Sequence, residues 1–200
     1  MSRCVSHDEI LARLEAGGIV AVPTDTVYGL VCSMDSTVAI ERIYDLKGRN
    51  KIKALIALVS SIDMARSVVE EWPEQADRLA RAYWPGALTI VLPKGKRVSE
   101  SMCSGVGTVG VRVPAHEELC EIIDRVGPLA STSANRSGNA SPTEAAHVLE
   151  QFEGVDVCVL DGGPCDGGVP STVVEIIEGD AMVHRAGAID PETIDQLLEV

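Results

Sequence analysis

Short apolar runs alternate with helical patterns along almost the whole chain, and this alternation limits the possible folds more than any other feature. The runs Ile19–Val22, Ala54–Val59 and Ala87–Leu92 have the length and composition of buried strands. Between the first two runs, apolar residues recur at helical spacing over about 36–46. Strands and helices that interleave in this way predict an α/β protein whose sheet is largely covered by helices.

The rest of the chain continues this pattern. The further elements that we expect are a helix from a capping box at 6–9 to Gly17, helices at about 62–71, 74–83, 117–126, 143–152 and from 190, and strands at about 27–32, 109–113, near 129, 155–160, 172–177 and 181–185. In the strand Val109–Val113 the three valines share one face, whereas Gly110 and Arg112 lie on the other. The polar segment 93–107 is typical of a mobile loop. No repeat or linker interrupts the chain, so we predict a single domain over 1–200.

The composition disfavours several classes of protein. The formal net charge is −13 and aromatic residues make up 3%. A general nucleic-acid binder needs cations for phosphates and aromatic rings for bases, so this class has little support. No apolar run approaches the ~20 residues of a membrane span, and the N-terminus lacks the apolar core of a signal peptide. We therefore predict a cytoplasmic protein without membrane contact.

The six cysteines and four histidines are scattered, without a CxxC pair or another metal-ligand spacing. Cys32, Cys120 and Cys158 sit inside apolar patterns, where a free cysteine packs as a small hydrophobic residue. We expect neither a disulfide framework nor a zinc site.

The segment Lys47–Lys53 carries four cations among its seven residues, in a chain with 17 basic and 30 acidic residues. A basic cluster in a loop between a helix and a strand is typical of a site that holds an anion. The alternative is that these cations complement the dipole at the end of the preceding helix and are otherwise solvated.

One familiar nucleotide-binding motif occurs in the wrong context. Gly105–Gly110 satisfies the dinucleotide pattern GxGxxG, but a polar loop precedes it and a predicted strand follows it. A dinucleotide site needs the strand before the glycines and a helix after them. A Walker A sequence, a GxSxG elbow and an HExxH pair are absent. The sequence therefore gives no support to a Rossmann, P-loop or simple hydrolase site.

Polar residues gather at the ends of several predicted strands. Thr24–Thr26 follows a buried strand, Ser131–Ser137 is dense in hydroxyls and N–H donors, and Arg112, Ser171 and Arg185 stand beside other strands. Taken singly, these residues are explained as turn caps or as solvated groups. Taken together they predict a polyanion site, with cations for phosphates, hydroxyls for oxygens and no obvious nucleophile.

Eight segments follow one another in a fixed order between about Gly17 and Ile189: PTDTVYGL, KGR, WPGALTIVL, TVGVRVP, STSANRSG, SPT, PSTVVEI and HRAGAI. In this order they resemble the YrdC/TsaC family of L-threonylcarbamoyladenylate synthases. The resemblance implies a strongly twisted mixed α/β sheet, flanked by helices, that encloses a cationic cavity. It also implies a reaction that joins L-threonine, bicarbonate and ATP into threonylcarbamoyl-AMP and releases pyrophosphate. Partner proteins would then transfer the threonylcarbamoyl group to adenosine in tRNA.

The resemblance also implies a role for individual residues. Lys47 and Arg49 would be catalytic, with Lys47 beside the phosphates. The residues that surround threonine would be Thr26, Arg112, Ser131 and Ser171. The residues that face ATP would be Arg49, Lys53, Thr108, Ser133, Ser141 and Arg185. Mg²⁺ would share in neutralising the triphosphate, through ligands that the sequence does not identify.

Some positions leave alternatives open. Asp25 is a magnesium ligand, a partner for the threonine amine or a turn residue. Ser141 is expected both to cap the helix over 143–152 and to face ATP. Leu58 stands where long members of the family have a histidine near threonine. Because the chain stops at Val200, it resembles the short members that have no separate C-terminal domain.

Three other functions compete with this interpretation. One is an RNA-binding module with a concave cationic surface, although the acidic composition allows at most weak direct RNA binding. Another is a paralogue that has kept the fold and lost the activity. The last is the carbamoyl-adenylate chemistry of hydrogenase-maturation carbamoyltransferases, which carry this kind of domain inside much larger chains.

We predict that Arg49→Ala and Lys47→Ala each abolish turnover and leave the fold intact, because a phosphoryl-centre displacement depends on charge neutralisation. Pyrophosphate release measures the turnover, and circular dichroism measures the fold. Near-wild-type release from either variant would show that the phosphate-binding assignment is wrong.

Overall fold

The computed structural model describes residues 2–4, 6–48 and 53–199. Its strands are β1 (Ser2–Cys4), β2 (Val20–Val22), β3 (Gly29–Ser33), β4 (Ile56–Leu58), β5 (Leu88–Pro93), β6 (Thr108–Arg112), β7 (Leu129–Ser133), β8 (Cys158–Leu160), β9 (Thr172–Ile177) and β10 (Asp180–Arg185). Its helices are α1 (His7–Glu15), α2 (Thr37–Lys47), α3 (Ile62–Val68), α4 (Glu74–Tyr83), α5 (Glu100–Cys103), α6 (Glu117–Val126), α7 (Ala145–Gln151) and α8 (Pro191–Leu198). None of the helices in these ranges is long and apolar enough to cross a membrane.

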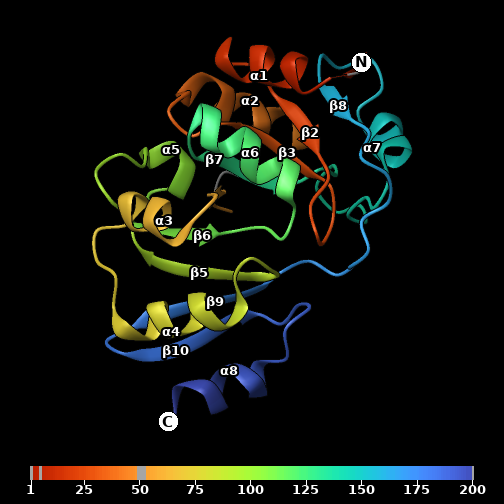
Figure 1. Ribbon diagram of the computed structural model, residues 1–200. Helices are drawn as coiled ribbons and strands as arrows, with labels where there is room; N and C mark the ends of the chain where they lie inside the picture. Colours follow the sequence, from red (N-terminus) through yellow and green to blue (C-terminus); the bar gives the residue numbers. More distant parts are fainter. Residues whose placement is uncertain (1, 5, 49–52, 200) are drawn as a thin grey trace.

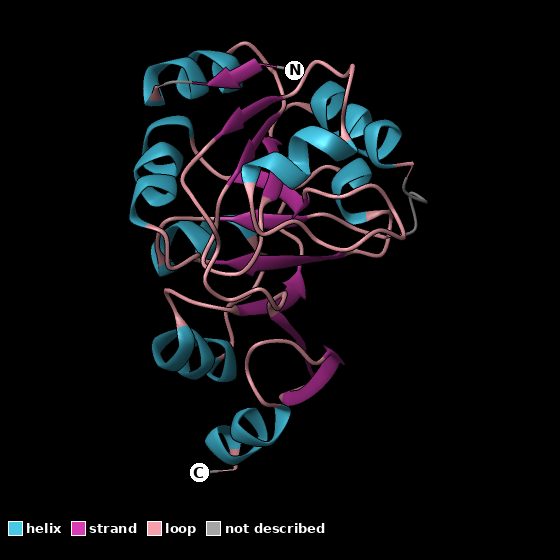
Figure 2. Ribbon diagram, turned by 90° about the vertical axis from the view of Figure 1, so that its right-hand side faces the viewer, coloured by secondary structure: helices cyan, strands magenta, loops and turns pink. Residues whose placement is uncertain are grey.

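The described strands form one mixed sheet in the order β1-β8-β2-β3-β7-β4-β6-β5-β9-β10. The pairs β1–β8, β2–β8, β4–β6 and β5–β9 are parallel, and the remaining neighbours are antiparallel. The sheet twists, so that β2 and β3 run across the direction of β5 and β9 (Figure 1), and helices lie against both of its faces (Figure 2). The predicted class, a twisted mixed α/β sheet flanked by helices, is confirmed.

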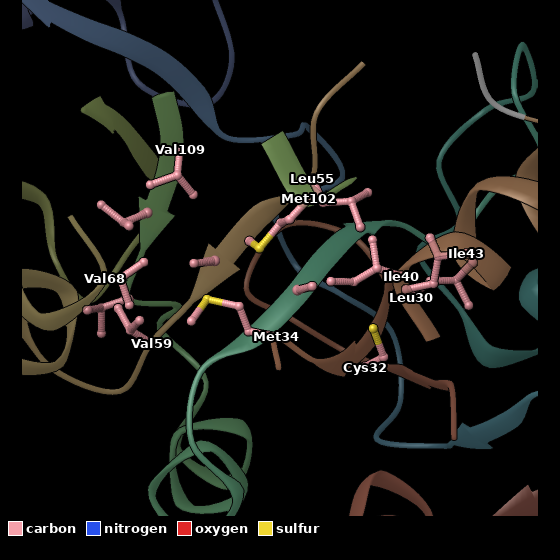
Figure 3. Close-up of a cluster of buried hydrophobic side chains, with 14 of the residues drawn as sticks. Leu30, Cys32, Met34, Ile40, Ile43, Leu55, Val59, Val68, Met102 and Val109 are labelled. Carbon is pink, nitrogen blue, oxygen red and sulfur yellow. The ribbon is translucent and has the colours of Figure 1, made fainter. Parts of the chain in front are cut away.

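Two apolar clusters hold the helices against the sheet. The smaller cluster lies under α1 and α6, where Leu14 and Ile122 pack with Val31 and Leu129 of the sheet. The larger cluster lies on the opposite face and includes Leu30, Cys32, Ile40 and Ile43 (Figure 3). Successive side chains of a strand point to opposite faces, so neighbours such as Leu30 and Val31 enter different clusters.

The alternation predicted for the strand over 109–113 is also found. Val109, Val111 and Val113 are buried in the larger cluster. Gly110 and Arg112 instead line a cavity on the other face. The residues of the GxGxxG pattern lead into β6, so the rejection of a Rossmann site agrees with the fold.

Two elements were not predicted. The strand β1 has no apolar run to mark it, and it joins the sheet through its backbone pairing with β8. The helix α5 lies inside the segment 93–107, which the sequence predicted to be a mobile loop. That prediction is wrong for Met102 and Cys103, because both side chains are fully buried in the larger cluster. The Met102 carbonyl also accepts a hydrogen bond from the Leu55 amide (2.9 Å).

The prediction for the cysteines is only partly correct. Cys32, Cys103, Cys120 and Cys165 are free, as expected. Cys158 is disulfide-bonded, whereas the apolar pattern around it predicted a free thiol.

We predict that Ile40→Ala lowers the free energy of unfolding by about 2–5 kcal/mol, because it leaves a cavity in the larger cluster. Val38 lies on the same helix, and 71% of it is exposed, so Val38→Ala is the matched control and should change stability by less than about 0.5 kcal/mol. Urea unfolding measures both variants. Equal midpoints for the two would contradict this description of the core.

Candidate functional site

A cavity of about 310 Å³ opens on the sheet face that carries α1 and α6. Side chains two residues apart on a strand lie on the same face of the sheet, so one strand contributes first to the apolar cluster and then to the cavity lining. In β7, Leu129 packs under the helices, whereas Ser131 and Ser133 line the cavity. In β3, Val31 belongs to the cluster and Gly29 lines the cavity. The cavity is therefore the uncovered continuation of a face that the helices cover elsewhere.

Most of the predicted site residues meet in this cavity. The lining includes Thr26, Thr108, Arg112, Ser131, Ser133, Ser141, Ser171 and Arg185. Lys47 and Lys53 are not part of the described lining, and Lys53 is exposed. Arg49 lies outside the described residues, so the structure does not place it. The roles given to all of these residues stay predictions.

The charged side chains among the described lining residues are Arg112 and Arg185. The other polar lining side chains in the described ranges are hydroxyls, and none is an Asp, Glu, His, Cys or Lys residue. Such a lining can bind and orient an anionic ligand, but it offers no evident base to activate a hydroxyl nucleophile. The cationic character of the cavity as a whole stays a prediction, because Asp25 offsets the charge of Arg112.

Arg112 reaches the cavity from the end of β6 and is held by two separate segments, the loop after β2 and the turn before β5. Its Nε donates to the Gly86 carbonyl (2.9 Å), and its two terminal nitrogens donate to Thr26 Oγ1 (3.0 Å) and Asp25 Oδ1 (2.6 Å). Burial lowers the pKa of Arg112, and the charge and hydrogen bond of Asp25 act in the opposite direction. Since a guanidinium has five N–H donors, two remain for a ligand after these three bonds.

Thr24 shapes the loop that presents Thr26. The Thr24 hydroxyl accepts hydrogen bonds from the amides of Thr26 (3.1 Å) and Val27 (3.3 Å) and donates to the Val27 carbonyl (2.7 Å). This is the local hydrogen bonding by which a threonine stabilises a turn. Farther along the loop, the buried Tyr28 hydroxyl donates to the Gly163 carbonyl (2.8 Å), and burial raises its pKa to about 12. The loop is therefore fixed at both ends.

A second group of hydroxyls joins β5, β9 and β10. Thr89 Oγ1 and Ser171 Oγ lie 2.9 Å apart, and Arg185 donates to the Ser171 carbonyl (2.7 Å) and hydroxyl (3.2 Å). Burial lowers the pKa of Arg185, and the nearby charge of Arg112 adds to this effect. The two guanidinium charges therefore lie close together at the cavity, and they favour an anionic ligand.

Lys47 has an environment that the sequence did not indicate. It ends α2, and Gly48 follows it in the left-handed conformation (φ 58°) that favours glycine. Its side chain is buried, and its ammonium donates to the carbonyls of Ser133 and Asn135 (2.6 Å for Asn135) and to Asn135 Oδ1 (3.2 Å). Lys47 thus holds the turn after β7 in place, whatever its role beside phosphates.

Ser141 lines the cavity but does not cap a helix. The helix α7 begins at Ala145 with Glu144 at its N-cap, where no side chain makes the capping hydrogen bond. The prediction that Ser141 caps the helix over 143–152 is therefore wrong, because the helix starts later than its pattern suggested. The predicted contact of Ser141 with ATP is not affected.

Sequence reasoning missed several groups that shape the site. The Gly86 carbonyl and Thr89 both belong to the segment WPGALTIVL, but their contacts with Arg112 and Ser171 come from distant parts of the chain. The only local signal was that Thr89 interrupts an apolar strand with a hydroxyl. The Asn135 side chain donates to the carbonyls of Arg136 and Asn139, as a donor-rich segment predicts, but sequence reasoning missed that its oxygen also accepts from Lys47 and from the Ser133 hydroxyl (2.6 Å for Ser133).

Comparison with known proteins gives matches over most of the chain. The family model Sua5_yciO_yrdC, described as "Telomere recombination", matches residues 12–187. Threonylcarbamoyl-AMP synthase of Pyrococcus abyssi is 41% identical over 188 residues, which are 92% of this chain and 55% of that protein. Threonylcarbamoyl-AMP synthase of Bacillus subtilis is 38% identical over 94% of this chain and 55% of its own. The crystal structure of P. abyssi Sua5 complexed with L-threonine has a TM-score of 0.91 at 39% identity, covering 94% of this chain and 56% of that chain.

The sheet order and the polar cavity on one of its faces define a protein of the YrdC-like α/β class. With the match over residues 12–187, the chain belongs to the Sua5/YciO/YrdC family, and the resemblance inferred from the eight segments is confirmed. The chain spans about half the length of these two curated relatives, 55% in both cases. That this chain shares the activity, substrates and partners of those longer proteins is therefore a proposal.

We predict that Lys47→Met lowers the free energy of unfolding by about 1–3 kcal/mol, because the carbonyls of Ser133 and Asn135 lose a buried donor. This modifies the expectation that a Lys47 variant leaves the fold intact. The matched control is Lys96→Met, since Lys96 is exposed and its loss should have little effect. Urea unfolding of both variants checks the difference, and equal stabilities would show that Lys47 has no structural role.

Proposed function

We propose that this chain forms L-threonylcarbamoyl-AMP and pyrophosphate from L-threonine, bicarbonate and ATP, for the threonylcarbamoyl modification of adenosine in tRNA. The observation that carries the proposal is the lining of the cavity, whose charged side chains in the described ranges are two arginines among hydroxyls. Two relatives at 41% and 38% identity are threonylcarbamoyl-AMP synthases. The P. abyssi Sua5 structure, at 39% identity, is a complex with L-threonine.

The proposed chemistry needs positioning more than a protein nucleophile. The threonine nitrogen bonds to the carbon of carbon dioxide supplied by bicarbonate, and a proton leaves to give a carbamate. A carbamate oxygen then bonds to the α-phosphorus of ATP, while the bond from that phosphorus to the bridging oxygen of pyrophosphate breaks. Displacements of this kind are accelerated by alignment of the reactants and by neutralisation of charge. A lining of donors without a base suits both requirements.

Individual residues receive roles within this proposal. Arg112 directs its two remaining donors to the threonine carboxylate, a planar anion that a guanidinium binds bidentately. Thr26, Ser131 and Ser171 bind the rest of the amino acid. The residues proposed for ATP are Arg49, Lys53, Thr108, Ser133, Ser141 and Arg185, with Lys47 beside the phosphates.

Magnesium enters the proposal with the nucleotide. The described residues contain no group of three or more His, Cys, Asp or Glu side chains that could hold a metal ion. The Asp25 carboxylate, which was one candidate ligand, is bonded to Arg112. The described side chains therefore do not fit a protein-held Mg²⁺ ion. We assign Mg²⁺ to the phosphates of ATP, where this ion commonly keeps most of its water ligands, and no step here depends on it.

The wider setting follows from the product. An adenylated carbamate is an activated acyl donor, so proteins that transfer the group to tRNA are the expected partners, with at most weak direct RNA binding by this chain. A cytoplasmic location and a single domain over 1–200 belong to the same proposal. An RNA-binding module or a degenerate paralogue remains the alternative, and no described feature favours either one.

The decisive measurement is pyrophosphate release from ATP and Mg²⁺, with threonine and bicarbonate each supplied or omitted. We expect release to require both, and to be lost when serine or valine replaces threonine. Release without threonine would indicate another carbamoyl acceptor. Absence of release, with ATP still bound, would favour a degenerate or RNA-binding module.

A pair of matched variants assigns this activity to the cavity. Arg112→Lys keeps the charge and removes the fork of donors, so kcat/KM for threonine should fall about 10- to 100-fold. Arg42→Lys makes the same change at an exposed position of α2 and should leave kcat/KM unchanged. Equal activities in the two variants would place the reaction elsewhere.

A further inference from the structure

Asp25 lies behind the cavity wall, although its two neighbours in the loop line the cavity. Thr24 and Thr26 are part of the described lining, whereas Asp25 is not. Its Oδ1 accepts a hydrogen bond from a terminal nitrogen of Arg112 (2.6 Å) and another from the Ala115 amide (3.1 Å). The carboxylate therefore faces the arginine and the chain segment that follows β6.

The ion pair between Asp25 and Arg112 is well shielded from water. The side chain of Arg112 is 5% exposed and that of Asp25 is 16% exposed. Water and salt screen such a poorly exposed ion pair much less than a surface pair, and its hydrogen bond is charge-assisted. Asp25 can thus hold the guanidinium in one orientation.

Three contacts from two segments, the loop after β2 and the turn before β5, fix the plane of this guanidinium. They are the Gly86 carbonyl at Nε and the side chains of Thr26 and Asp25 at the terminal nitrogens. Asp25 supplies the only carboxylate among these three acceptors. Without it, the planar guanidinium as a whole would be free to tilt about its two remaining contacts, and the two donors left for a ligand would no longer be aligned.

The contacts argue against the other roles open to Asp25. The turn is already held by the Thr24 hydroxyl, which accepts from the amides of Thr26 and Val27. A partner for the substrate amine would be expected to line the cavity, and Asp25 does not. The described residues provide no cluster with which Asp25 could share a metal ion.

We propose that Asp25 is a positioning residue, which holds Arg112 so that its two remaining donors meet the carboxylate of the amino-acid substrate. The inference rests on the proposed function for the amino-acid substrate and for the contact of its carboxylate with Arg112. It assigns Asp25 no contact with substrate, and its effect passes through the guanidinium.

The test is Asp25→Asn, assayed by pyrophosphate release. The amide keeps the size of the side chain and can still accept from the Ala115 amide, but it loses the charge that holds Arg112. We expect KM for threonine to rise about 10- to 100-fold, as for a small misplacement of a binding group, while KM for ATP changes less than about threefold. The control is Asp63→Asn, which removes the same charge from an exposed pair with Arg66 (3.3 Å) and should leave both KM values unchanged.

Two further readouts separate positioning from other roles. If Asp25 acts through Arg112, then adding Asp25→Asn to Arg112→Lys should lower kcat/KM little more than Arg112→Lys alone. The preference for threonine over threonine amide, which has no carboxylate, should fall in Asp25→Asn by the same factor as the affinity for threonine. Full additivity of the two substitutions, or an unchanged preference, would overturn the proposal. A defect that excess Mg²⁺ repairs would make Asp25 a metal ligand instead.

A folding defect in Asp25→Asn and an absence of wild-type turnover each call for a separate measurement. If Asp25→Asn does not fold, Asp25→Glu keeps the charge and displaces the carboxylate, and it should raise KM for threonine by a smaller factor. Unaltered kinetics in that variant would overturn the proposal. Wild-type turnover tests the function itself. If the wild type shows no turnover, calorimetric titration with L-threonine compares the affinities of the wild type and of Asp25→Asn. Equal affinities, or an absence of binding, would count against the positioning role of Asp25.

Discussion

A guanidinium that is taken out of water must have most of its donors satisfied by the protein, and this requirement governs the arrangement around Arg112. The residue is 4% exposed in a chain with a net charge of −13. Its partners come from the loop after β2, which supplies the side chains of Asp25 and Thr26, and from the turn before β5, which supplies the Gly86 carbonyl. Satisfying one side chain therefore brings together segments that are far apart in the sequence.

The division of one sheet face between an apolar cluster and a cavity follows from side-chain size. Where α1 and α6 cover the face, the strands present aliphatic residues such as Val31 and Leu129. Where the face is open, the same strands present Gly29 and Ser131, and a Cβ added to Gly29 would lie 3.3 Å from the Ser131 hydroxyl. Gly110 is still tighter, since an added Cβ would lie 2.9 Å from the Thr89 methyl group. Small residues leave the volume into which hydroxyls and arginines point.

Much of this architecture could be predicted from the sequence because its signals are local. Apolar runs and helical periodicity located most of the elements, and the alternation in β6 placed Arg112 opposite the valines. Most residues assigned by resemblance do line one cavity. The features that were missed depend on distant contacts: Asp25 and Arg112 are 87 residues apart in the chain. In the same way, the sequence indicates only a cation at a helix end for Lys47. In the structure its ammonium is buried against carbonyls at the end of β7 and in the turn that follows.

The order of strands in the sheet has a consequence for how the chain acquires its structure. β7 lies between β3 and β4, β8 lies between β1 and β2, and β9 lies beside β5. Strands made early are thus joined by strands made much later, and such non-local pairing slows folding. On the ribosome, β3 and β4 would each present an unpaired edge until residues 129–133 had emerged. The nascent chain therefore passes through a stage in which strand edges are open to pairing with other chains, and the cavity wall is completed late in synthesis.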